Sequence, residues 1–186
     1  FTDNTTLARL PIKFEPPPFT NITYSVTNSF TNATLLNSGF EDGLSFPEYL
    51  YSPAGQYVAG WFLSSGEVNT MGTGATNSPW FTAPYEGERF LDINGATQGG
   101  VIQTNFLTVP GREYRVTYAY AYNPASPSNT TAEVRVLDRS MVSIHTDAVA
   151  PATSPPGIWI TNIFNFTATT DLTLLEIASL TTVSGT

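Results

Sequence analysis

The stretch Tyr114-Arg115-Val116-Thr117-Tyr118-Ala119-Tyr120-Ala121-Tyr122 decides the fold class of this chain. Large apolar or aromatic residues stand at every second position, and small or polar residues fill the positions between them. Because successive side chains of a β-strand point to opposite faces, this alternation predicts a strand with one buried face.

The same alternation recurs elsewhere in the chain. Val134 and Val136 alternate with Glu133 and Arg135. Further strands are predicted at 90–94, 101–108 and 158–167, and in a segment that contains Leu175 and Ile177. In the strand 158–167, one face carries Ile158, Ile160, Phe164 and Phe166. Fourteen glycines and 14 prolines separate these segments, and no ten-residue stretch shows helical periodicity. The pattern predicts an all-β sandwich.

Length and charge narrow the class of protein further. A chain of 186 residues fits one domain, and 41% hydrophobic against 12% charged residues excludes intrinsic disorder and coiled coil. Fifteen acidic and seven basic residues give a net charge of −8. Nucleic acids and anionic membranes attract basic surfaces, so neither is an expected partner. No apolar run approaches the length of about 18 residues that a spanning helix needs.

Residues suited to catalysis are scarce. The chain has no cysteine, which excludes disulfides, thiolate metal sites and a thiol nucleophile. His145 is the single histidine, and we expect it to be a surface or packed residue rather than a zinc ligand. The acidic pairs Glu41 with Asp42 and Glu86 with Glu88 are expected to be solvated acids of turns or strand edges. The sequence predicts a non-enzyme.

Two features favour an extracellular or cell-surface location. The chain begins at Phe1 without an initiator methionine, as a processed secreted protein does. Five N-x-Ser/Thr sequons are candidate glycosylation sites, although abundant threonine also creates such triplets by chance: Asn4, Asn21, Asn32, Asn129 and Asn165.

The N-terminal residues form a second pattern. In the segment 9–15, Leu10, Ile12 and Phe14 fall on one side, and Pro11 lacks the N–H that a central strand would need. Pro16, Pro17 and Pro18 follow as a stiff polyproline spacer. We therefore divide the chain into an arm, residues 1–20, and a β-sandwich, residues 21–186. The arm either extends from the sandwich or packs against it.

An ordered set of short motifs suggests a relationship to known proteins. The set comprises Asn37-Ser38-Gly39-Phe40-Glu41, Gly60-Trp61, Gly66-Glu67-Val68, Glu86-Gly87, Leu91-Asp92-Ile93-Asn94-Gly95, Gly100-Val101-Ile102-Gln103-Thr104, Val109-Pro110-Gly111 with Tyr114, Asn123-Pro124, Phe166-Thr167-Ala168-Thr169 and Ser179-Leu180-Thr181. From Asn32 onward the chain resembles the bacterial choice-of-anchor C family and related plant cell-wall proteins of galactose-binding-like fold. The resemblance implies a jelly-roll sandwich in a secreted, often wall-associated protein.

The chain departs from this pattern at its C-terminal end. The family closes with a last strand, whereas this sequence stops at Gly185-Thr186. The resemblance thus implies an open groove that an extended segment could fill by donor-strand complementation. Our first hypothesis is a structural subunit of an extracellular filament, pilus-like appendage or tubule, a homopolymer whose 7–15 arm completes the neighbour's sheet. The interface residues would be Leu7, Leu10, Ile12 and Phe14. The alternative is a trimmed C-terminus with the arm folded in cis.

The motif around Asn37 also implies a cofactor. It is similar to the start of jelly-roll carbohydrate-binding modules, in which the glutamate commonly helps to hold a structural calcium. The resemblance points to Glu41, with Asp42 and Asp92 as helpers, and carboxylates suit Ca²⁺. Ser38-Gly39 differs from the usual order, and the acid that the resemblance expects from the missing last strand is absent. Either the site is lost or an incoming chain completes it.

The second functional hypothesis is a secreted module that binds carbohydrate or cell wall. Exposed aromatic faces suit the apolar faces of sugars. Trp80 and Tyr85 are the candidate platform, because they lie in or near long loops. Trp61 belongs to the Gly-Trp motif and is expected in the core.

Overall fold

The structure is a computed structural model. It describes residues 25–26, 33, 35–43, 48–51, 53–58, 60–72, 83–95, 98–122, 131–149 and 157–181. Every regular element in these ranges is a β-strand. No helix in this part of the chain is long and apolar enough to cross a membrane.

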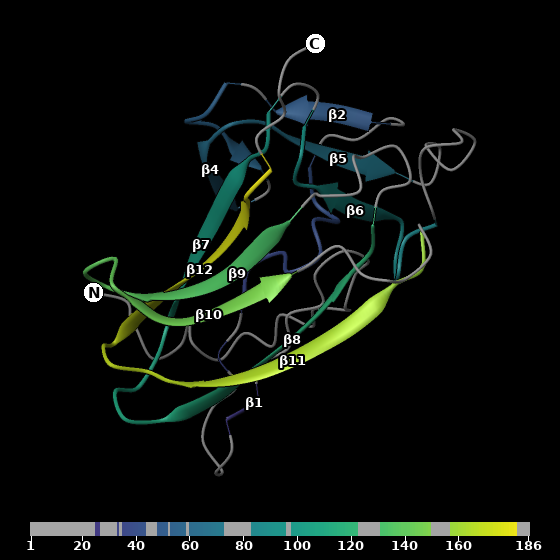
Figure 1. Cartoon of the computed structure of the whole chain (residues 1–186). Coiled ribbons are helices and arrows are strands. Elements are labelled where there is room, and N and C mark those ends of the chain that lie inside the picture. The colour runs from purple at the N-terminus through teal and green to yellow at the C-terminus, as the bar shows by residue number, and fades with distance from the viewer. Residues whose placement is uncertain are drawn as a thin grey trace, which may run out of the picture.

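The strands form two layers (Figure 1). One layer is a six-stranded sheet with the order β10 (Ser143–Val149), β9 (Ala132–Asp138), β12 (Leu172–Ser179), β7 (Val101–Leu107), β4 (Trp61–Ser65) and β3 (Tyr57–Val58). The other layer contains two three-stranded sheets: β1 (Ser25–Val26), β8 (Glu113–Tyr120) and β11 (Ile160–Thr167), and β2 (Glu48–Tyr51), β5 (Val68–Gly72) and β6 (Arg89–Asp92). The predicted all-β sandwich is confirmed.

The C-terminal half is wound as a jelly roll. The hairpin β9·β10 lies innermost, β8·β11 encloses it, and β7·β12 encloses both, each pair being antiparallel. β12 also pairs with β9, which joins the outer and inner pairs in one sheet. This nesting carries the chain back and forth between the layers and brings β12 to the centre of the six-stranded sheet.

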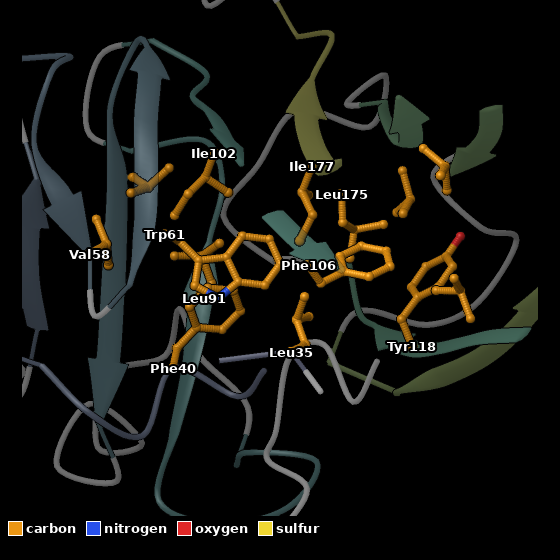
Figure 2. Close-up of a cluster of buried hydrophobic side chains, with 14 of the residues drawn as sticks. Leu35, Phe40, Val58, Trp61, Leu91, Ile102, Phe106, Tyr118, Leu175 and Ile177 are labelled. Carbon is orange, nitrogen blue, oxygen red and sulfur yellow. The ribbon is translucent and has the colours of Figure 1, made fainter. Parts of the chain in front are cut away.

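The core fills the space between the layers (Figure 2). Its largest fully buried side chain is Trp61, whose Nε1–H donates to the Asn37 carbonyl oxygen at 3.1 Å and whose ring lies 5.1 Å from that of Phe40. Core side chains come from all three sheets, among them Leu63, Ile102, Val116, Tyr118, Leu175 and Leu91. The expected core position of Trp61 is confirmed.

The predicted alternation matches the observed burial of β8 as far as Tyr118 and breaks at Ala119, which was expected on the opposite face but is fully buried. In β8, Tyr114, Val116 and Tyr118 are buried, whereas Glu113 and Arg115 are exposed. One prediction at a strand start was wrong.

Ile158 is 52% exposed and precedes β11 instead of sharing its buried face. The reason is a turn at Gly157, which has φ of 77° and donates its N–H to the Tyr122 carbonyl oxygen. The strand therefore begins only at Ile160, after the chain has left this turn.

Several of the short motifs have structural roles. A Cβ at Gly66, which has φ of 67°, would lie 1.9 Å from the Gly99 carbonyl oxygen, and one at Gly100 would lie 2.4 Å from that of Glu67. Only glycine permits this approach of two backbones. The Asn37 side chain holds the backbone of Asp42 through both N–H and carbonyl contacts. These residues therefore hold the loops that contain them against neighbouring backbone.

Residues 1–24 lie outside the described ranges, so the predicted arm and its boundary at residue 20 stay predictions. The donor-strand residues Leu7, Leu10, Ile12 and Phe14 belong to that segment. The described part of the sandwich begins with β1, whose Ser25 and Val26 pair with Arg115 and Tyr114 of β8.

Candidate functional site

Six residues lie in register across the full width of the six-stranded sheet. Tyr57 pairs with Phe62, Phe62 with Gln103, Gln103 with Glu176, Glu176 with Arg135, and Arg135 with Thr146. We call these six residues the transverse row. At the usual strand spacing of about 4.8 Å the row spans about 24 Å, which is the length of several linked sugar rings.

The transverse row lies on the outer face of this sheet. Its sequence neighbours in each central strand point into the core and are buried: Leu63, Ile102, Leu175, Ile177, Val134 and Val136. Because strand side chains alternate between faces, the row residues point away from the sandwich interior. The row therefore carries aromatic, amide and charged groups on one surface.

An aromatic pair forms one end of the transverse row. Tyr57 is 71% exposed, the second most exposed of the large hydrophobic residues that the structure describes. Its ring centroid lies 5.3 Å from that of Phe62, and the two planes are inclined by 55°. An exposed phenol ring that is supported from one side can stack against a flat apolar ligand surface.

A group of charged side chains lies in the middle of the row. Arg135 Nε is 3.1 Å from Glu176 Oε1 and 3.5 Å from Oε2 of Glu133. The N–H does not point along these contacts, so they are ion pairs rather than aligned hydrogen bonds. The Glu176 side chain is only 10% exposed. Burial raises the pKa of its carboxyl group, Arg135 opposes this rise, and Glu133 adds to it.

Gln103 stands between the aromatic pair and the charged group. Its Oε1 is buried and has no hydrogen-bond partner among the described residues. A buried amide oxygen without a donor costs about 1–3 kcal/mol, and folded proteins leave few such atoms. A ligand hydroxyl or ammonium group on this face would supply the missing donor once the flexible side chain turned toward it.

Tyr85, which the sequence predicted as a sugar contact, lies elsewhere. It precedes β6, is 39% exposed, and packs edge-on against Trp159 with ring centroids 6.0 Å apart. Its hydroxyl is within 3.2 Å of the Thr161 hydroxyl, and Trp159 Nε1–H donates to the Ala83 carbonyl oxygen at 2.8 Å. The polar groups of this pair already have partners, and Trp159 covers Met71 and Phe90. The pair therefore fastens the 83–88 loop to the start of β11. Trp80 lies outside the described residues.

The three residues implied for calcium have separate roles. Glu41 accepts hydrogen bonds from the backbone N–H groups of Glu88 and Arg89, and burial raises its pKa. Asp42 is exposed, and Asp92 Oδ1 accepts the N–H of Asn94. Among the described residues no three His, Cys, Asp or Glu side chains gather into a group that could hold a metal ion. Calcium stays a prediction that rests on resemblance alone.

Two further residues from the sequence predictions lie on described strands. Asn165 is exposed on β11, and its Oδ1 accepts a hydrogen bond from Arg115. Asn4, Asn21, Asn32 and Asn129 lie outside the described ranges. His145 is partly buried and stacks on Phe164, with ring centroids 4.3 Å apart.

Sequence reasoning missed the transverse row because its six residues come from six strands. Each strand shows only an ordinary polar or aromatic residue at an outward position. The one signal in the sequence was the pair Glu133 and Arg135, which marks an outward-facing side of β9. Their alignment with Glu176 and Gln103 depends on the register of β12, which no local pattern encodes.

Comparison with known proteins gives distant structural likenesses. No family model matches the chain, and no curated protein matches it. The chain is similar to an isomalto-dextranase of Arthrobacter globiformis T6 complexed with panose, at 18% identity and a TM-score of 0.43, over 71% of this chain and 20% of that one. It is also similar to a structure described as "CBM4 structure and function", at 10% identity and a TM-score of 0.38, over 70% and 74%. Both scores are too low for either likeness to carry an argument about function.

Proposed function

We propose that this β-sandwich is a carbohydrate-binding module whose ligand lies along the transverse row. The observation that carries the proposal is the alignment of an exposed aromatic ring, an amide and paired charges on one sheet face. Sugars combine apolar ring faces with hydroxyl groups, so their binding sites pair aromatic platforms with a few placed polar groups. Tyr57 would stack on a sugar ring, while Gln103 and Glu176 would accept hydrogen bonds from hydroxyls.

Two exposed tyrosines make a matched test of this proposal. The full chain is passed over a panel of immobilised polysaccharides, and retention is compared for the wild type, Tyr57→Ala and Tyr85→Ala. We expect Tyr57→Ala to weaken binding about three- to tenfold, because an aromatic contact contributes about 0.5–1.5 kcal/mol. Tyr85→Ala should retain wild-type binding.

The other outcomes separate the alternatives. If Tyr85→Ala, and not Tyr57→Ala, loses binding, the site lies at the position predicted from the sequence and the transverse row is not the site. If the wild type is retained by no polysaccharide, the proposed function is wrong. The donor-strand polymer stays a separate prediction, since its arm lies outside the described residues.

A further inference from the structure

The charges in the transverse row and at Glu133, which lies beside it on β9, are unequal. Two carboxylates, Glu133 and Glu176, share the single guanidinium of Arg135. Arg135 is also the only lysine or arginine within the described strands of the six-stranded sheet. The middle of the row therefore carries one negative charge in excess.

The excess charge is placed where solvent screens it incompletely. The side chains of Glu133 and Arg135 are 27% and 32% exposed, and that of Glu176 is 10% exposed. Charges in such partly buried positions interact more strongly than fully solvated ones. Gln103 Oε1 adds a further acceptor without a donor among the described residues. The centre of the row thus sets two carboxylates and an unpartnered amide oxygen against one guanidinium, whose Nε–H also has no hydrogen-bond acceptor among the described residues.

We propose that the ligand is a polysaccharide that carries ammonium groups, such as a chain of β-linked glucosamine units, and not a uronate or sulfated polymer. This inference rests on the proposed function. A sugar ammonium group would pair with the excess carboxylate charge, and an ammonium or hydroxyl would donate to Gln103. The tyrosine at the end of the row would meanwhile stack on an apolar sugar face. A ligand carboxylate or sulfate placed there would face Glu133 and Glu176 and be repelled.

The test compares hexasaccharides that differ in the substituent that each sugar unit carries. Glucosamine hexamer and N-acetylglucosamine hexamer share one backbone, and the first bears ammonium groups at pH 6. Isothermal titration calorimetry with the full chain should show about tenfold tighter binding of the glucosamine hexamer, with a difference that shrinks as salt is added. Cellohexaose serves as the neutral unsubstituted reference, and a hexameric uronate should bind most weakly.

Two variants that each remove one carboxylate test whether the preference for glucosamine hexamer comes from the charges at the transverse row. Glu133→Gln removes the excess charge and should reduce the preference for glucosamine hexamer to about twofold or less. Glu88→Gln also removes one carboxylate, but Glu88 is an exposed residue of the loop before β6 and should leave the preference unchanged. Equal loss of preference in both variants would mean that net charge, and not the row, selects the ligand, which overturns the inference.

The outcomes for this inference and for the proposed function differ. If the neutral or uronate hexamers bind as tightly as glucosamine hexamer, the inference is wrong while carbohydrate binding stands. If none of the hexamers binds and no polysaccharide retains the protein, both are wrong.

Discussion

The two faces of the six-stranded sheet carry different kinds of side chain. The inner face is closed by Trp61, Leu63 and their neighbours, which are fully buried and interchangeable only with residues of the same shape. The outer face holds a phenol ring, an amide and unequal charges, of which one amide oxygen has no partner among the described residues. The same strands thus supply the core packing on one side and partly exposed aromatic, polar and charged groups on the other.

The largest expected effect comes from two adjacent residues of β4. Trp61→Ala should lower the free energy of unfolding by about 3–5 kcal/mol, because it leaves a cavity at a fully buried position and removes the hydrogen bond to the Asn37 carbonyl oxygen. Phe62→Ala, one residue on and facing outward, should cost about 1 kcal/mol, since Phe62 is only partly buried. Denaturant unfolding measures both, and equal losses would contradict the assignment of the two faces.

An intermediate effect is expected at Arg135. Arg135→Met leaves Glu133 and Glu176 facing each other without a cation, so unfolding free energy should fall by about 1–3 kcal/mol at neutral pH. Part of this loss should be recovered in acid, where a carboxyl group takes up a proton. Arg115→Met, on the exposed side of β8, is the control and should change stability by less than about 0.5 kcal/mol. A loss of the same size in the control would show that the row plays no special part.

The smallest effect is a pH dependence of stability. The pKa of Glu176 is raised in the folded protein above its ordinary value of 4.5, so the folded state holds this proton more tightly than the unfolded state. The corresponding stability is fully present below pH 4.5 and is lost as pH rises through the folded-state pKa. Glu41 contributes with the same sign.

Glu176→Gln removes one of these two contributions. The decline of stability above pH 4.5 should therefore be shallower in Glu176→Gln than in the wild type, as measured by urea midpoints at several pH values. A decline of equal slope would show that Glu176 is solvated in the folded protein.

The sequence predicted the inner face better than the outer one. Burial of alternate residues leaves a local trace, so Tyr114, Val116 and Tyr118 identified β8 and its buried side without further information. Gly157 was not recognised as a turn, and this misplaced Ile158.

The outer face depends on which strands become neighbours. Glu176 meets Gln103 on one side and Arg135 on the other because β12 lies between β7 and β9. Sequence separation hides such contacts, because period-2 patterns specify a face but not a partner. The search for exposed aromatic residues in loops consequently led to Tyr85, which stays a prediction, and overlooked Tyr57, an exposed ring that packs on Phe62 at the end of the transverse row.

The nested winding of the jelly roll sets the order in which the chain can assemble. The β9·β10 hairpin closes through the short turn 139–142, whereas β7·β12 joins segments separated by all the strands between them. Closing a short loop costs less entropy than closing a long one, so we expect the hairpin to form early and the outer pair to form late. Gln103 and Glu176 belong to that outer pair. We therefore expect the transverse row to be completed late in folding, and a ligand bound there, as proposed above, would slow unfolding of the finished jelly roll.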